Sequence, residues 1–194
     1  MKLLHIDSSI TGAQSVSRQL SAAVVERLRA VHQNLSVTYR DLEADPVPHH
    51  SGALLAAKAT GQVLPDLSEA EAVVDEFVAA DIVVIGVPMY NFSIPSQLKA
   101  WIDCLAVAGK TFSYSESGVK GLAGDKRIIL ASARGNIYTD TPSASLDHQE
   151  TFLRGFFDFL GVTDLEIVRA EGVAFGPEHR ARAVESALAQ AAAL

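Results

Sequence analysis

Residues Asp81–Val87 read DIVVIGV, and this stretch decides the fold class. Positions 82–85 form an unbroken apolar run, without the polar and apolar alternation of a half-solvated strand. A second run, Ile128–Leu130, has the same character. Strands that are apolar on both sides are typical of a parallel sheet whose two faces are covered by helices. The stretch therefore predicts an α/β protein.

Further strands and helices are predicted to alternate on both sides of this stretch. The five strand candidates are Lys2–Asp7, Leu35–Leu42, Asp81–Val87, Arg127–Ser132 and Leu165–Ala170. A crossover helix is predicted from Leu20, Ala23, Val24, Leu28 and Val31, and others over roughly Gly52–Thr60, Ser68–Ala80, Pro95–Val107, Gln149–Leu160 and Pro177–Leu194. The segment Gly109–Gly124 is predicted to be irregular. This order indicates one doubly wound α/β domain over residues 1–194, with a five-stranded parallel sheet and helices on both faces.

The composition narrows the class of protein. A chain of 194 residues has the length of one compact α/β domain. The net charge of −7 opposes binding to nucleic acid or anionic lipid, and no apolar run has the length that a membrane span requires. Asp7 interrupts the first apolar stretch before a signal-peptide core could form, and the single Cys104 cannot make an internal disulfide. We expect a cytoplasmic protein that binds neither nucleic acid nor membrane.

The loop between the first strand and the first helix is rich in hydroxyl groups. It reads DSSITGAQSVSR over residues 7–18. In an open parallel sheet, ligands bind beyond the carboxyl ends of the strands, where the strand order reverses. The hydroxyls of Ser9, Ser15 and Ser17, with free N–H groups at the helix start, would surround a phosphate there. The alternative is that Ser15 or Ser17 only caps the helix and the other serines are solvated.

Two further loops follow buried strands and belong to the same edge. Residues 86–99 expose aromatic and amide groups after the third strand, which suits a planar amphipathic ring, although these aromatics would equally well cap the core. After the fourth strand, Gly135 permits close backbone approach, and Asn136 offers a donor and an acceptor. The sequence contains neither GxGxxG nor GxxxxGK[ST], so a mononucleotide such as FMN fits these loops better than a dinucleotide.

The motifs PMYNFSIPSQLKAWID, SSITGAQSVS and TFSYSESGVKGL resemble the FMN-dependent NADH azoreductase family of bacteria. The resemblance covers essentially the whole chain and implies a flavodoxin-like fold with one noncovalent FMN per subunit. It implies that Ser9, Ser15, Val16 and Ser17 hold the FMN phosphate, that Met89, Tyr90, Asn91 and Phe92 lie along the isoalloxazine ring, and that Ser132, Ala133, Arg134, Gly135 and Asn136 meet its pyrimidine edge. The last loop departs from the usual Ser/Thr-Arg-Gly-Gly run at Ala133 and Asn136.

The resemblance also implies the chemistry. NADH or NADPH reduces the flavin, which then passes two electrons to an azo compound or a quinone in a ping-pong cycle, so no catalytic side chain is required. We expect a flat aromatic pocket with Phe92, Tyr114, Tyr138 and Phe159 as its walls. The six histidines lack metal-site spacing, so no metal is expected. Cys104 is predicted to be a small buried hydrophobe.

Two other functions compete with this interpretation. A flavodoxin-type electron carrier binds FMN without a substrate pocket and presents an acidic docking face, whereas these ring loops are nearly uncharged. A serine hydrolase would need a nucleophile elbow, and GxSxG is absent.

Assembly is the last expectation from the sequence. The resemblance implies a homodimer with FMN at the interface, in which Tyr114 or Phe112 reaches the neighbour's flavin. The helix over Pro95–Val107, with Leu98, Trp101, Ile102 and Leu105, is a candidate for the contact. The alternative is that these four side chains face only their own sheet.

Overall fold

A computed structural model describes residues 1–116 and 118–194. Its main sheet contains five parallel strands in the order β2-β1-β3-β6-β7. The strands are β1 (Lys2–Asp7), β2 (Ser36–Asp41), β3 (Ile82–Pro88), β6 (Arg127–Ala133) and β7 (Asp164–Ala170). The expected five-stranded, flavodoxin-like parallel sheet is confirmed. Strand order reverses between β1 and β3, so the loops that follow these two strands border the site where ligands bind in such sheets.

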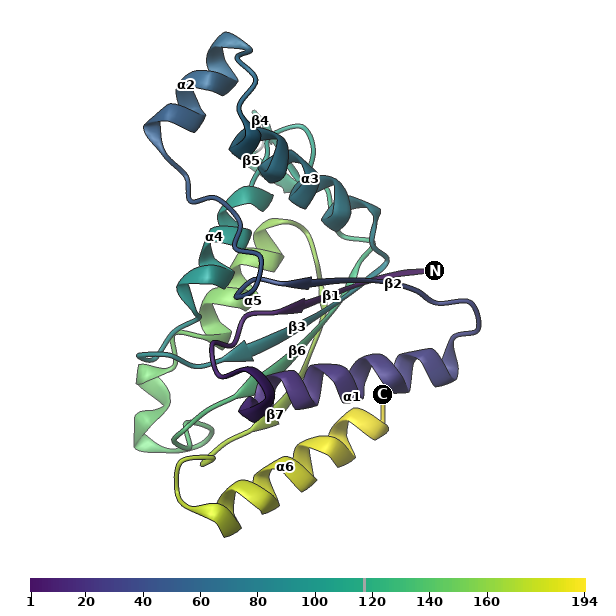
Figure 1. Ribbon diagram of the computed structural model, residues 1–194, viewed down its shortest axis with the longest axis vertical. Helices are drawn as coiled ribbons and strands as arrows, with labels where there is room; N and C mark the ends of the chain where they lie inside the picture. The colour runs from purple at the N-terminus through teal and green to yellow at the C-terminus, as the bar shows by residue number, and fades with distance from the viewer. Residues whose placement is uncertain (117) are drawn as a thin grey trace.

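Helices cover both faces of the sheet (Figure 1). The helices α1 (Val16–Val31) and α6 (Pro177–Ala192) lie on one face, while α3 (Pro65–Ala79), α4 (Ser96–Leu105) and α5 (Glu150–Phe159) cover the other. The helix α2 (Gly52–Thr60) stands at the far end of the molecule from α6. Helix α3 begins three residues before the predicted Ser68, because Pro65 is well suited to the first turn of a helix.

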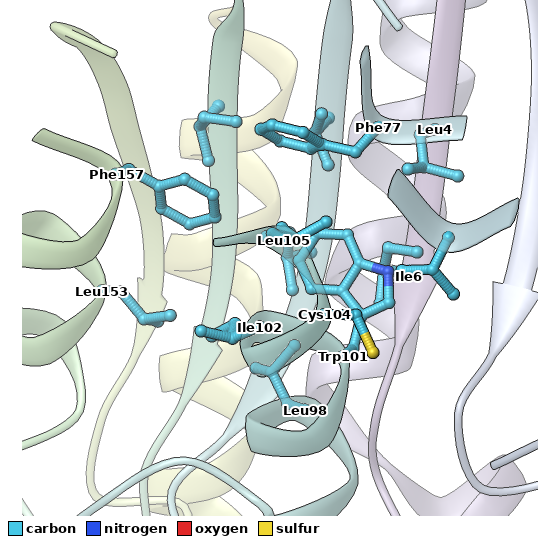
Figure 2. Packing of buried hydrophobic residues seen from close by; sticks show 14 of the residues in the cluster. Leu4, Ile6, Phe77, Leu98, Trp101, Ile102, Cys104, Leu105, Leu153 and Phe157 are labelled. Carbon is cyan, nitrogen blue, oxygen red and sulfur yellow. The ribbon is translucent and has the colours of Figure 1, made fainter. Parts of the chain in front are cut away.

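The apolar face of α4 packs on its own sheet. Figure 2 shows Leu98, Trp101, Ile102 and Leu105 in the core beside Phe77, and none of these four side chains is more than 1% exposed. The Trp101 and Phe77 rings meet edge to face with centroids 6.1 Å apart. The prediction that this face contacts a second subunit is therefore wrong, because its side chains are already covered within one chain.

The segment Gly109–Gly124 is not irregular throughout, as the sequence predicted. It contains an antiparallel hairpin, β4 (Phe112–Ser115) and β5 (Gly118–Gly121), outside the main sheet. Gly121 packs on the end of α5, where a Cβ atom would lie 2.1 Å from the Gly161 nitrogen. Gly121 and Gly161, which lack side chains, permit this close backbone contact. The two strands of four residues are also too short and too polar to show a clear period.

The described part of the chain contains neither a candidate membrane-spanning helix nor a cluster of metal-binding side chains. Within residues 1–116 and 118–194, no helix is long and apolar enough to cross a membrane. The same residues contain no group of three or more His, Cys, Asp or Glu side chains arranged to hold a metal ion.

Candidate cofactor site

Loops at the carboxyl edge of the sheet enclose a cavity of about 520 Å³. Its volume lies within the usual range for small-molecule sites. The residues that line it come from the loops after β1, β3, β6 and β7 and from α6; they are Ser9, Thr11, Gln14, Ser15, Val16, Ser17, Pro88, Met89, Tyr90, Ala133, Gly135, Val173 and Arg180. Eight of these thirteen residues belong to the predicted cofactor set. The structure thus brings together the three loops that the sequence selected.

The hydroxyl end of the cavity is built on the start of α1. Ser15 is the N-cap residue, and its hydroxyl accepts a hydrogen bond from the Arg18 backbone N–H at 3.2 Å. The Ser15 and Ser17 hydroxyls lie 3.1 Å apart. The backbone N–H groups of Val16 and Ser17 belong to the first turn, where no helical carbonyl is available to them. Ser15 therefore caps the helix and also lies beside N–H and O–H donors that face the cavity.

Tyr90 ties the phosphate loop to the ring loop. Its hydroxyl lies 3.3 Å from the Ser9 hydroxyl and accepts a hydrogen bond from the Ile10 N–H at 3.2 Å. The Ser9 carbonyl accepts from the Arg18 guanidinium, which also forms a two-oxygen ion pair with Asp41 at 2.6 Å. The ion pair and hydrogen bond with Asp41 raise the pKa of Arg18 and lower that of the Asp41 carboxyl. Arg18 thus positions the loop from behind.

The ring loop turns sharply after β3. Tyr90 and Ser93 exchange two backbone hydrogen bonds of 2.9 and 3.0 Å, and the two residues between them have positive φ angles. Asn91, with φ of 48°, tolerates this conformation, but Phe92, with φ of 70°, is strained there. The Phe92 carbonyl accepts from the His148 N–H, which holds the turn in place. Phe92 is 46% exposed, so its ring stands free beside the cavity loops rather than capping the core.

The loop that leaves β6 alternates between two environments. Ala133 and Gly135 line the cavity, and the Ala133 carbonyl accepts from the Met89 N–H at 2.8 Å. Ser132 and Arg134, which alternate with them along the chain, are each 1% exposed and lie beneath the loop. Asn136 is exposed, and its side-chain oxygen accepts from the Ile137 N–H. Of the five loop residues predicted to meet the pyrimidine edge, two line the cavity.

Arg134 is the centre of a buried ion cluster. Its guanidinium contacts Glu150, Asp147 at 3.1 Å and Glu171 at 3.1 Å, and its Nε donates to the Gln149 side chain. The sequence analysis expected Arg134 to meet the flavin, but its side chain is fully buried among carboxylates and does not line the cavity. The cluster fixes the loop from below.

Glu171 connects this cluster to the backbone of the next loop. One of its oxygens accepts from the Tyr138 and Thr139 N–H groups. Burial by itself would raise the pKa of Glu171, but these N–H donors and Arg134 outweigh it and hold the pKa below its ordinary value. The loops after β6 and β7 are further joined by the Val173 and Ala174 N–H groups, which donate to the Arg134 and Gly135 carbonyls.

The four expected pocket walls occupy different places. Tyr138 is 7% exposed and packs over the Arg134 guanidinium, 5.8 Å from ring centre to the central carbon. Phe159 and Tyr114 both contact Phe112 at the hairpin, with ring centroids 4.9 and 5.2 Å from it. Neither these three rings nor that of Phe92, the fourth expected wall, lines the cofactor cavity of its own chain. Tyr114 is 74% exposed, whereas Phe112 is buried and cannot reach a second subunit.

Five residues that line the cavity were missed by the sequence analysis. Thr11, Gln14 and Pro88 flank predicted positions, whereas Val173 and Arg180 come from the β7 loop and from α6. The topology alone placed the β7 loop at the same edge, because β7 is parallel to β6. The position of the β7 loop at this edge could therefore have indicated its role. The alanine-rich helix that follows the loop carries no motif that points to a ligand.

Two other titratable groups lie outside the cavity lining: Cys104 is in the core, whereas Tyr39 is 53% exposed. Cys104 is 3% exposed, and burial raises the pKa of its thiol to about 11, which confirms a buried hydrophobe rather than a nucleophile. Burial raises the pKa of Tyr39 to about 12, and its hydroxyl donates to Asp7. None of the hydrogen bonds of Ser9, Ser15 or Ser17 in the described residues involves a histidine, so no hydrolase dyad is present there.

Comparison with known proteins agrees with the geometry. The model of a family described as having a flavodoxin-like fold matches residues 1–194. An FMN-dependent NADH:quinone oxidoreductase of Methylocella silvestris is 57% identical, over 96% of this chain and 95% of that protein. A crystal structure of an azoreductase from Bacillus anthracis is 31% identical with a TM-score of 0.89, covering 100% of this chain and 97% of that one.

A second Bacillus anthracis structure contains the cofactor that the cavity suggests. It is an FMN-dependent NADH-azoreductase in complex with FMN, 27% identical with a TM-score of 0.89. The alignment covers 99% of this chain and 96% of that chain. The expected relationship to FMN-dependent NADH azoreductases is thereby confirmed.

Proposed function

This chain belongs to the flavodoxin-like family that includes FMN-dependent NADH:quinone oxidoreductases, and from that premise we propose that it reduces quinones and azo compounds with electrons from NADH. The observation that carries the proposal is the composition of the cavity. One end offers hydroxyl and N–H donors, the other offers the turn that carries Tyr90, and none of the described carboxylates lines the cavity. FMN has the matching parts, a phosphate dianion and a planar ring.

The residues present fit FMN. Ser9, Ser15 and Ser17 would hold its phosphate with the first-turn N–H groups of α1. Met89 and Tyr90 would lie along the ring, and the backbone at Ala133 and Gly135 would meet the pyrimidine edge. When bound, FMN supplies the redox chemistry, accepting hydride from NADH and releasing two electrons to the acceptor in a ping-pong cycle. The protein itself orients the ring and shields one of its faces.

A second cavity supports a reductase over an electron carrier. It measures about 580 Å³, shares Tyr90 with the first cavity, and is also lined by Ile94, Pro95 and Phe152. These apolar and aromatic groups suit a flat acceptor such as a quinone. Its one charged residue, Lys99, is paired with Asp103. In the described part of the chain no carboxylate lines this cavity, whereas an electron carrier would present an acidic docking face beside its flavin.

We further propose that the enzyme works as a homodimer. Tyr114 is 74% exposed on the hairpin, although it belongs to a compact aromatic group with Phe112. A large exposed aromatic residue of this kind suits an interface. In a two-fold dimer, Tyr114 would cover the open ring face of the neighbour's flavin. This arrangement gives a function to a side chain that does not line the cavity of its own chain.

The central experiment follows flavin and nicotinamide together. We expect the purified protein to release FMN, and not FAD, on denaturation. It should oxidise NADH in the presence of a quinone. Parallel assays would replace the quinone with an azo dye, and NADH with NADPH. Release of FAD, or NADH oxidation that does not respond to any acceptor, would contradict the proposal.

The dimer is tested separately, by sedimentation and activity over the same range of concentrations. We expect activity per subunit to fall as the dimer dissociates, and Tyr114→Ala to change the KM for the quinone. A monomer with full activity would refute the dimer proposal while leaving the reductase proposal intact.

A further inference from the structure

Arg180 is the one charged residue that lines the cofactor cavity within the described part of the chain. It lies in the first turn of α6, and its Nη2 donates to the Gln14 carbonyl of the phosphate loop at 2.7 Å. We propose that Arg180 recognises the FMN phosphate by its charge, so that the last helix of the fold clamps the cofactor. The inference rests on the proposed FMN site and adds a specificity residue to it.

The charge of a bound phosphate would be only partly compensated by the start of α1. The protein carries a net charge of −7, and a phosphate dianion adds to it. The hydroxyl and N–H donors of the loop are neutral, so they satisfy the phosphate oxygens without compensating the charge. Among the residues that the structure describes, no carboxylate lines the cavity to cancel the positive charge of Arg180.

The other arginine beside the phosphate loop does not serve this role. Arg18 stands on the opposite side of the loop, where Asp41 takes up its guanidinium through two oxygens at 2.6 Å. The Asp7 carboxylate lies 3.8 Å away, and the Ser9 carbonyl accepts two further N–H bonds. Arg18 is therefore saturated and electrically compensated.

Arg180 retains free donors. A guanidinium has five N–H groups, and one hydrogen bond to Gln14 leaves most of them unused. In the described residues, no carboxylate lies within ion-pair distance of Arg180, since the neighbouring Glu178 pairs with Arg182. The bond to Gln14 holds one terminal nitrogen of this exposed guanidinium against the loop. The remaining donors and the charge are available to an anionic ligand in the cavity.

The test compares FMN with riboflavin, which has the same ring but lacks the phosphate. Protein stripped of flavin would be titrated with each ligand by fluorescence quenching. We expect Arg180→Gln, which keeps an amide donor for Gln14, to weaken FMN binding about tenfold and to leave riboflavin within twofold. Arg180→Lys should recover most of the affinity for FMN, and added salt should narrow the gap between wild type and Arg180→Gln.

Arg182→Gln is the matched control, because Arg182 lies on the same helix with its side chain 63% exposed and outside the cavity lining. It should bind both ligands as the wild type does. Equal weakening of FMN and riboflavin by Arg180→Gln would overturn the proposal, because it would mean that Arg180 only positions the loop. Unchanged FMN binding would overturn it as well. A wild-type protein that binds no FMN would instead refute the cofactor site itself.

Discussion

The loop that leaves β6 separates two polar regions that differ in how their groups are partnered. Beneath it, the Arg134 side chain is 1% exposed and meets three carboxylates and a glutamine. Above it, the Ser15 and Ser17 hydroxyls bond to each other, and the one side-chain hydrogen bond of Arg180 within residues 1–116 and 118–194 goes to the Gln14 carbonyl. Buried polar groups that bind no ligand normally find their hydrogen-bond partners within the protein. We infer from this difference that the Arg134 cluster, whose groups are all paired, supports the loop. The hydrogen-bond donors above the loop, which have fewer partners, mark the binding site.

The backbone of β6 creates this separation. Successive residues of a strand point to opposite sides, so Ser132 and Arg134 enter the ion cluster while Ala133 and Gly135 face the cavity. The small side chains on the cavity side leave room for a planar ring, and the large one on the other side fills the interior. Substitutions on each side of the loop therefore test whether one region supports the loop and the other binds the ligand.

The largest effect is expected beneath the loop. Replacing Arg134 with methionine would remove the guanidinium that contacts Asp147, Glu150 and Glu171 together, although Glu150 would keep its ion pair with Arg169. Removing one partner of a buried ion pair costs about 3–5 kcal/mol, and because Asp147 and Glu171 are only half-buried we expect a loss at the lower end, about 3 kcal/mol. Urea unfolding of the flavin-free protein measures this loss. Arg127→Met is the control, because Arg127 pairs with Glu166 where both are partly exposed, and it should cost less than about 1 kcal/mol. Equal losses in the two variants would mean that the cluster is not a special support.

The next effect is expected above the loop. Ser17→Asp places a carboxylate where the phosphate would lie, whereas Ser17→Ala removes one hydrogen bond of about 1 kcal/mol, or roughly a fivefold change in FMN affinity. We expect the aspartate variant to bind FMN at least about tenfold more weakly than the alanine variant. Fluorescence titration measures both, with riboflavin as the ligand that lacks the charge. Equal FMN affinities would show that Ser17 only lies near a helix cap.

The fold was predictable because its signals are local. The sheet strands β3 and β6 are nearly continuous apolar runs, and the loop after β1 combines a strand end, serines and a helix start within twelve residues. The hairpin over Phe112–Gly121 was missed, because its pairing is stabilised by glycine contacts with α5 that lie some 40 positions away in sequence. Only the packed structure reveals that contact.

The site was predictable in part for the same reason. Serines 9, 15 and 17 and the turn at Tyr90 follow strands directly, so topology places them together. The role of Arg134 was not predictable, because its partners Asp147, Glu150 and Glu171 lie on other elements. Arg180 sits on a helix with no motif, and its relation to Gln14 spans 166 positions. Charge pairs across elements leave no period in a sequence.

A smaller effect is expected from acid. The pKa of Glu171 lies below its ordinary value of 4.5, so its carboxylate contributes stability that is present above about pH 4.5 and is lost as pH falls through the lowered pKa. Glu171→Gln should therefore lose less stability than the wild type between pH 7 and pH 3. Urea unfolding at several pH values measures the slope. Glu178→Gln, at an exposed position of α6, should follow the wild type, and a parallel profile for Glu171→Gln would contradict the role of Glu171 in the cluster.

The smallest effect concerns Ser15, which lies above the loop and has two roles, as the helix cap of α1 and as part of the cavity wall. Ser15→Ala removes the bond from the Arg18 N–H and should cost the flavin-free protein about 1 kcal/mol. Ser51 is the matched control, since its hydroxyl accepts from the Leu54 N–H at the same distance of 3.2 Å and caps α2, far from the cavity. Both alanine variants should unfold at similarly lower urea concentrations, but only Ser15→Ala should also weaken FMN binding, by a few fold. If FMN affinity falls equally in both variants, the loss reflects stability alone, and the donors above the β6 loop do not include Ser15.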